Sequence, residues 1–279
     1  MFRVNIINAI NNLYTFGSKV SSDTPIAHNL IQAQGEPLEK TIKKIFLDHI
    51  PDTLTNKNKH YFSYQGSANN PPDLKLKGGD IVEIKKIQSH KTPSISLNSS
   101  WPRDKMNKDD PKINQQCRDC EKWIEADLFY AIGVVPKDHK ETFSLFFLHG
   151  ECMNAPTKFY EKFYKNLQTD IAKLSYNFHL ETKELGRLNK IDPLGNTHLR
   201  IRGMFGMPNP FRHFNFCKVD QTKKLNVFCL MTKEKYNSFK NEDRDLIEQN
   251  KGISKDLKKI KSPVDIRKYI ECFYIHFAK

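Results

Sequence analysis

Several features that would place this 279-residue chain in a familiar class are missing from it. There is no internal repeat and no low-complexity linker, and the length allows one large domain or two small ones. The longest apolar runs, such as residues 129–135, fall far short of a membrane span. The N-terminal segment is too rich in Asn for the core of a signal peptide. Without a secretory context, the six cysteines predict reduced thiols in the cytoplasm.

Acidic residues are also in deficit, with 45 Lys and Arg against 32 Asp and Glu and a formal net charge of +13. A basic balance is typical of proteins that bind a phosphate backbone, although basic cytosolic proteins are frequent. The charge is dispersed, and no Lys/Arg block resembles a disordered tail. The chain has no Gly-x-Ser-x-Gly elbow, no Walker loop and no His-Glu-x-x-His motif. Neither a nucleotide cofactor nor ATP-driven translocation is therefore expected.

What the chain does contain is a segment that can bring two carboxylates and an ammonium onto one face of a β-hairpin. Residues 77–79, Lys-Gly-Gly, are typical of a three-residue hairpin loop with Gly in the left-handed conformation. Pairing across this loop puts Leu74 opposite Val82 and Asp73 opposite Glu83. Because side chains alternate along a strand, the two faces of the hairpin differ. The polar face holds Asp73, Lys75, Ile81, Glu83 and Lys85, and the core face holds Leu74, Leu76, Val82 and Ile84.

This arrangement is suited to metal-assisted hydrolysis of a phosphodiester. Directly opposed residues have β-carbons about 4.5–5.5 Å apart, so Asp73 and Glu83 would repel unless a cation lay between them. Mg²⁺ takes oxygen ligands and keeps waters for the nucleophile and the substrate. Lys85 can orient or help to deprotonate the attacking water and offset charge on the phosphate. The alternative is an ordinary surface hairpin with a Glu–Lys pair.

Glu39 is a further acidic candidate, on a helix expected over residues 27–49. It flanks the apolar stripe of that helix and can reach inward beside the hairpin. Spacing alone favours a simpler interpretation, in which Glu39 and Lys43 form a surface pair four residues apart.

The remaining pattern predicts a mixed α/β fold. Apolar runs predict strands over 94–97, 128–135, 143–148, 199–202 and 226–231. Helical spacing predicts helices over 6–13, 117–123, 155–174, 233–249 and 264–270. Trp101 and Trp123 are expected to pack in the core or in loops.

The cysteines support a competing hypothesis. Cys117 and Cys120, followed by His149 and Cys152, have the ligand types and pair spacing of a tetrahedral Zn²⁺ site. A basic chain with such a site could be a zinc-containing DNA-binding module without catalysis. Buried thiols are the default interpretation, because an apparent buried strand separates the two pairs.

A series of strings along the chain carries a family resemblance. Pro72-Asp73, nine further residues and then Glu83-Ile84-Lys85 resemble the signature of PD-(D/E)xK nucleases. Longer strings are similar to the NgoPII family of type II restriction endonucleases. They lie at residues 34–39, 70–73, 83–87, 97–102, 109–111, 117–123, 127–135, 181–186, 192–194, 199–206 and 209–211.

The resemblance implies a restriction-endonuclease-like fold, a mixed β-sheet core flanked by helices, as one domain over residues 1–279 with recognition elements within 180–240. It implies Mg²⁺-dependent cleavage of double-stranded DNA at the palindrome GGCC by a homodimer in the bacterial cytoplasm. Asp73, Glu83 and the carbonyl of Ile84 would hold Mg²⁺, Lys85 would act on the water, and Glu39 would support the metal site. A repair nuclease with the same core and no sequence preference remains an alternative.

DNA contacts are expected on two segments. Arg is the commonest reader of guanine, and Arg200 and Arg202 share strand parity beside Gly203. Phosphate contact is the alternative for each Arg, since most protein–DNA hydrogen bonds go to the backbone. The other candidates follow the catalytic segment or precede these arginines, and they are Asn98, Ser99, Ser100, Arg103 and Lys183.

Overall fold

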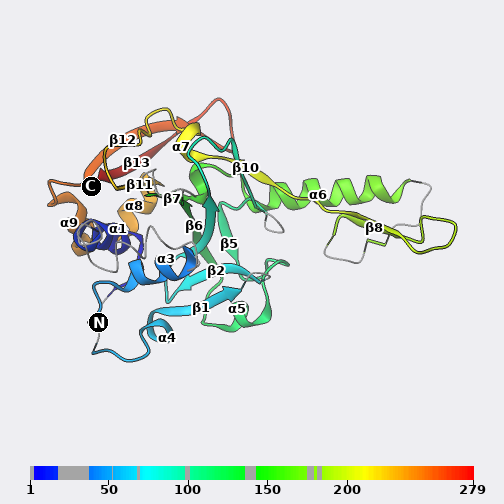
Figure 1. The fold of residues 1–279 in the computed structure, drawn as a ribbon, viewed down its shortest axis with the longest axis horizontal. Helices are drawn as coiled ribbons and strands as arrows, with labels where there is room; N and C mark the ends of the chain where they lie inside the picture. Colours follow the sequence, from blue (N-terminus) through cyan, green and yellow to red (C-terminus); the bar gives the residue numbers. More distant parts are fainter. Residues whose placement is uncertain are drawn as a thin grey trace.

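The computed structural model describes residues 3–17, 38–51, 53–67, 70–97, 101–135, 143–174, 179–180 and 184–279. Its centre is a mixed sheet with the strand order β1-β2-β3-β6-β7-β11-β13-β12, and β5 pairs with β6 (Figure 1). The strands are β1 (Phe62–Ser67), β2 (Asn70–Leu76), β3 (Ile81–Ile87), β5 (Lys105–Asn107), β6 (Glu125–Val134), β7 (Phe143–His149), β11 (Leu225–Thr232), β12 (Ser254–Lys261) and β13 (Tyr269–Ala278).

Helices lie on both sides of this sheet. They are α1 (Ile6–Phe16), α3 (Leu38–Leu47), α4 (Lys57–Tyr61), α5 (Gln115–Asp119), α6 (Thr157–Ala172), α7 (Pro210–His213), α8 (Lys233–Ser238) and α9 (Asn241–Glu248), with a 3-10 turn at Gly150–Cys152. One core layer packs α1 and α3 against the sheet, and the opposite layer includes residues of α5 and α7. β7 and β11 are buried along their whole length, which explains why they appear in the sequence as continuous apolar runs. The expected mixed α/β architecture is confirmed.

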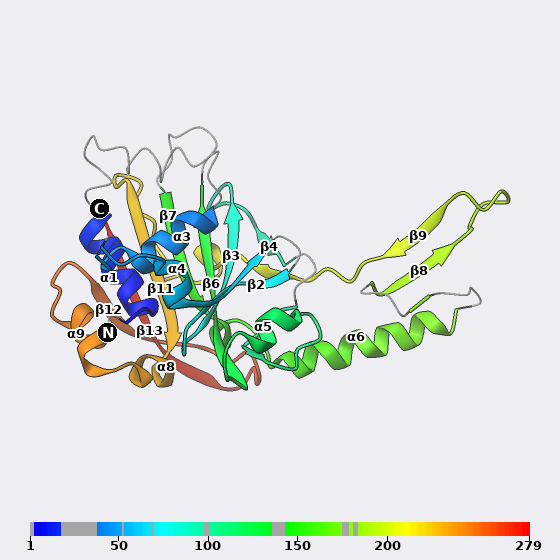
Figure 2. The same ribbon diagram turned by 90° about the horizontal axis from the view of Figure 1, so that it is seen from below.

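An arm projects from this body. It consists of α6 and the antiparallel pair β8 (Gly186–Asn189) and β9 (His198–Ile201), which extend away from the sheet in both views (Figures 1 and 2). A short pair, β4 (Ser94–Ser96) with β10 (Gly206–Pro208), lies where the chain returns to the body. Where the arm meets the body, Trp101 packs with Tyr164 and Leu185 in a small separate core.

Most of the predicted elements are present. The strands at 94–97, 128–135, 143–148, 199–202 and 226–231 and the helix at 155–174 are confirmed, and 233–249 forms two helices, α8 and α9. The 27–49 helix is seen from Leu38 onward, its earlier residues lying outside the described ranges. The helix at 117–123 is shorter and lies earlier, as α5. Trp101 and Trp123 are buried, as expected.

The helix predicted at 264–270 is wrong. This segment is the turn of a hairpin and the start of β13, which pairs with β12 on one side and β11 on the other. Its apolar spacing is helix-like only because the exposed turn residues Val264 and Ile266 precede the strand. None of the helices in the described ranges has the length and apolarity of a transmembrane span.

Candidate active site

The β2–β3 hairpin has the expected register near its loop. Leu74 pairs with Val82 and Lys75 with Ile81, and Gly78 adopts the left-handed conformation with φ +63°. Beyond Leu74 the two strands part, so the backbone of Asp73 does not pair with that of Glu83 within the described strands. Instead, Asp73 Oδ2 accepts a hydrogen bond of 2.5 Å from the backbone N–H of Ile84. A side chain thus replaces the next rung of the ladder and holds Asp73 at the fork between the strands.

Glu83 lies beside this fork and is only 3 % exposed. Its Oε2 accepts a hydrogen bond of 3.2 Å from Lys85 Nζ. Its Oε1 is buried and has no hydrogen-bond partner among the described residues. A buried carboxylate oxygen is costly unless it meets a donor or a cation. Glu83 therefore offers an oxygen ligand that the protein leaves open.

The electrostatics of the pair also suit a cation. Burial, and then the charge of Glu83, raises the pKa of Asp73 from 3.8 to about 7, although the hydrogen bond from Ile84 opposes this. Lys85 supplies one ammonium beside two carboxylates, which leaves excess negative charge when both are ionised. Two oxygen donors in this environment fit a hard divalent ion such as Mg²⁺.

Glu39 acts on Asp73 through its charge. It lies in the first turn of α3 and is half-buried. Its charge is close enough to raise the pKa of Asp73, as the smallest of the contributions. The role of Glu39 at the metal site stays a prediction.

Behind Glu83 lies a buried polar network that includes Arg103. Glu83 pairs with Tyr130 on β6, whose hydroxyl accepts hydrogen bonds from the backbone N–H of Arg103 and from Asn154. Arg103 is 1 % exposed, and its Nε donates to Asp110 at 2.7 Å. The predicted DNA contact of Arg103 is therefore corrected: its guanidinium has almost no accessible surface, and Asp110 balances its charge inside the protein. Sequence reasoning missed this network, for which the only signal was an Arg and an Asp seven residues apart.

The four candidate zinc ligands are not assembled. Cys117 is buried in an apolar layer, whereas His149 stacks on Phe129 and has Asp127 3.7 Å away. Cys152 Sγ lies 3.6 Å from the sulfur of Cys272, a residue outside the predicted set. Within the part of the chain that the structure describes, no group of three or more His, Cys, Asp or Glu side chains is arranged to hold a metal ion. The described residues therefore do not support the predicted Zn²⁺ site at Cys117, Cys120, His149 and Cys152.

The predicted DNA-binding arginines lie on the arm. Arg200 and Arg202 point to the same side, as their parity predicted, and both hydrogen-bond Glu184. Their side chains remain about half exposed, at 45 % and 58 %. The other candidates, Asn98, Ser99, Ser100 and Lys183, lie outside the described residues.

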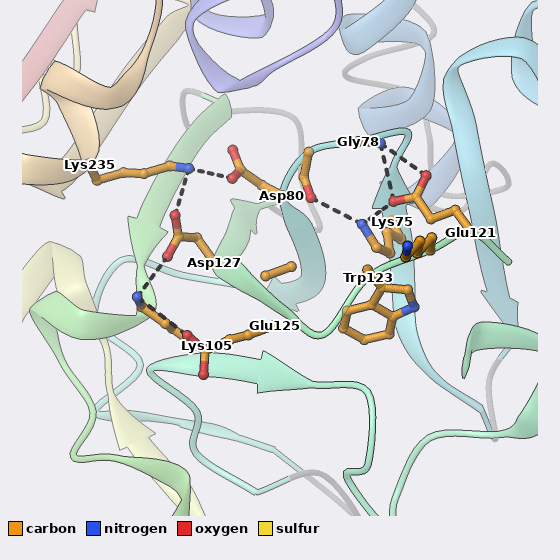
Figure 3. Close-up of a pocket in the computed structure, with 12 residues that line it drawn as sticks. Lys75, Gly78, Asp80, Lys105, Glu121, Trp123, Glu125, Asp127 and Lys235 are labelled. Carbon is orange, nitrogen blue, oxygen red and sulfur yellow. Dashed lines mark hydrogen bonds and ion pairs between the residues drawn. The ribbon is translucent and has the colours of Figure 1, made fainter. Parts of the chain in front are cut away.

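A polar cavity of about 470 Å³ lies at the loop end of the hairpin (Figure 3). Lys235 of α8 spans it and donates to Asp80, just before β3, and to Asp127 on β6. Lys75 is buried beside it and pairs with Glu121 at 2.6 Å. The predicted catalytic residues do not line this cavity, and most of its charges are paired with one another. We interpret the ion pairs around this cavity as structural contacts that hold the β2–β3 hairpin to its neighbours.

Comparisons with known proteins identify the family of the chain. The family model described as NgoPII restriction endonuclease matches residues 4–262. The chain is 36 % identical over 264 residues to the type II restriction enzyme NgoPII of Neisseria gonorrhoeae, and the match covers 93 % of this chain and 94 % of that protein. No solved structure matches the chain significantly. The fork that joins Asp73, Glu83 and Lys85 thus lies in a chain that belongs to the NgoPII restriction endonuclease family.

Proposed function

We propose that this protein makes Mg²⁺-dependent double-strand breaks in DNA at a short palindromic site, with GGCC as the sequence that the family resemblance implies. The observation that carries the proposal is the Asp73–Glu83 pair, in which one carboxylate has a raised pKa and the other an unpartnered buried oxygen. The relative of this chain from Neisseria gonorrhoeae is named a type II restriction enzyme, which supports the same class of reaction.

In this proposal Asp73, Glu83 and the carbonyl of Ile84 hold the cation, which supplies Lewis-acid polarisation of the scissile phosphate. Lys85 lies 3.2 Å from Glu83 and is half-buried, so its ammonium is fixed near the reacting centre. From there it orients the attacking water and offsets the charge that develops on the phosphate. Glu39 adds negative charge near Asp73 and supports cation binding.

We also propose that the protein cuts as a homodimer and contacts its site through the arm. One chain supplies one Asp73–Glu83–Lys85 centre, whereas a double-strand break needs two hydrolyses. A homodimer on a palindrome places one centre at each strand. Arg200 and Arg202 are proposed to contact the DNA of the site, because they are exposed and lie on the projecting arm.

A digest of sequenced phage DNA with and without Mg²⁺ tests the proposal, with Glu83→Gln as the control. We expect discrete fragments that map to GGCC and disappear in the control. Fragments ending at another sequence would retain the mechanism and replace the site. A Mg²⁺-dependent smear would indicate a nuclease without sequence preference, and no cleavage with any divalent ion would overturn the proposal.

A further inference from the structure

The far end of the arm is a loop with a firmly held conformation. It joins β8 to β9 over residues 190–197 and lies farthest from the sheet (Figure 2). The carboxylate of Asp192 accepts hydrogen bonds from the backbone N–H groups of Leu194, Asn196 and Thr197 and from the Thr197 hydroxyl, at 2.6–3.2 Å. These bonds hold the pKa of Asp192 well below its usual range. The loop is therefore organised by its own contacts and not by contacts with the body.

This loop holds an apolar side chain out in solvent. Leu194 is 84 % exposed, more than any other large hydrophobic residue that the structure describes. The turn that presents it is closed by a bond from Gly195 N–H to the carbonyl of Asp192, with Gly195 at φ +72°. A flexible loop could fold such a leucine back, but here the pinned backbone keeps it exposed. A pre-organised apolar tip of this kind is suited to contact with a partner.

The charge around the tip indicates the class of partner. Between residues 184 and 202, four Arg and Lys side chains stand against two carboxylates, Glu184 and Asp192. The Asp192 carboxylate is occupied by hydrogen bonds within the loop. The Glu184 carboxylate accepts hydrogen bonds from both Arg200 and Arg202. The segment that carries Leu194 therefore has a net positive charge, which suits a polyanion better than a second copy of this chain with its own net charge of +13.

We propose that Leu194 is an apolar wedge that enters the minor groove of bound DNA, partly unstacks a base step and bends the duplex. Proteins that bend DNA in this way insert Leu, Phe, Ile, Met or Pro side chains flanked by basic residues. Here the β8–β9 hairpin holds Leu194 away from the body, the hydrogen bonds of Asp192 fix the loop, and Lys190 adds a positive charge to the same loop. Leu194 acts as a positioning residue and not as a catalytic one. The inference rests on the proposed action on DNA.

The test compares Leu194→Ala with Ile266→Ala, because Ile266 is a similarly exposed loop residue, 76 % exposed, between β12 and β13. Each protein is bound, with Ca²⁺ in place of Mg²⁺, to a duplex that carries the site found by the digest. Stacking is followed with 2-aminopurine at successive positions, and bending with dyes at the two ends. We expect the wild type and Ile266→Ala to raise the fluorescence at one step several-fold and to bend the duplex. Leu194→Ala should lose both signals and bind about tenfold more weakly.

Unchanged stacking and bending in Leu194→Ala would overturn the inference while leaving the cleavage proposal intact, because the digest tests that separately. Light scattering without DNA tests whether the tip instead contacts a second copy of this chain. If Leu194→Ala dissociates a dimer that Ile266→Ala preserves, the tip is a contact between copies and the wedge is wrong. Asp192→Ala gives an independent check, since loosening the loop should weaken the bend with Leu194 still present. Equal melting temperatures of all four proteins would show that these effects do not arise from unfolding.

Discussion

The body of this molecule buries most of its large apolar side chains, whereas the arm exposes several of its own. In the body, the sheet is covered on both faces, and all of β7 is buried. In the arm, helix α6 buries only Tyr164 and exposes a stripe of three large side chains, which are Phe159, Phe163 and Leu167. A protein gains stability from apolar surface only when it removes that surface from water. Burial of apolar surface therefore stabilises the body, whereas the exposed side chains of α6 contribute little to the stability of the arm.

If catalysis belongs to the body, removing its ammonium should give the largest effect. Lys85→Ala should lower cleavage by on the order of 10²–10³-fold or more, since an oriented charge at the reacting centre is lost. DNA binding should remain near the wild-type value because the arm is unchanged. The measurement is single-turnover cleavage beside a filter-binding titration. Lys86→Ala, one residue along the strand and exposed, is the matched control. Full activity of Lys85→Ala would remove the fork from the mechanism.

The contrast in stability can be tested with two phenylalanines. Phe147 is fully buried at the centre of the sheet, and Phe163 is 53 % exposed on α6. Phe147→Ala should lower the free energy of unfolding by about 3–5 kcal/mol, through lost burial and the cavity that remains. Phe163→Ala should change it by less than about 0.5 kcal/mol. Urea titration measures both. A comparable loss from Phe163→Ala would show that the arm is part of the cooperative core.

The pH dependence of the body should report on Asp73. Because folding raises its pKa to about 7, the protonated carboxyl stabilises the fold below pH 4, and this contribution is lost as the pH rises through 7. Asp73→Asn keeps a hydrogen-bond acceptor for Ile84 and removes the charge. It should stabilise the metal-free protein at pH 8 by on the order of 1–3 kcal/mol while abolishing cleavage.

Thermal melts at pH 5 and pH 8, with and without Mg²⁺, provide the check. The wild type should gain more from Mg²⁺ at pH 8 than at pH 5, since a deprotonated Asp73 binds the cation. The variant should lose that difference. A variant less stable than the wild type at pH 8 would mean that the two carboxylates do not repel each other as the geometry implies.

The smallest expected effect concerns the arm and its choice of DNA. Arg200→Ala or Arg202→Ala should leave melting unchanged and cost about 1–3 kcal/mol of binding to the cognate site, if the side chain contacts a base. Equal weakening on all sequences, with a shallower salt dependence, would assign that arginine to a phosphate. Arg267→Ala, an exposed arginine in the turn between β12 and β13 and not on the arm, is the control. Competition binding with cognate and scrambled duplexes separates the outcomes.

Local rules predicted the hairpin because its information is local. The loop at 77–79 needs one left-handed residue, which Gly78 supplies, and alternation then sets the register of Leu74 with Val82. The buried strands β6, β7 and β11 were equally predictable, since continuous apolar runs mark strands covered on both faces. The helical prediction at 264–270 failed because β13 is specified by pairing with β11, about forty residues earlier in the chain.

By itself, then, the sequence determined the acid–acid–lysine segment, the hairpin register next to the loop and the main buried strands, but not the pairing of Asp73 with Glu83. The tertiary structure alone decided that Asp73 leaves the strand pairing to accept the Ile84 N–H, and that burial raises the pKa of this carboxyl. It also decided that Arg103 turns inward to Asp110, and that Lys235 clamps Asp80 from the other end of the chain. The physical reason is that spacing along a strand or helix fixes the face a side chain shares. Burial and the partner of a charge depend on segments far apart in the sequence.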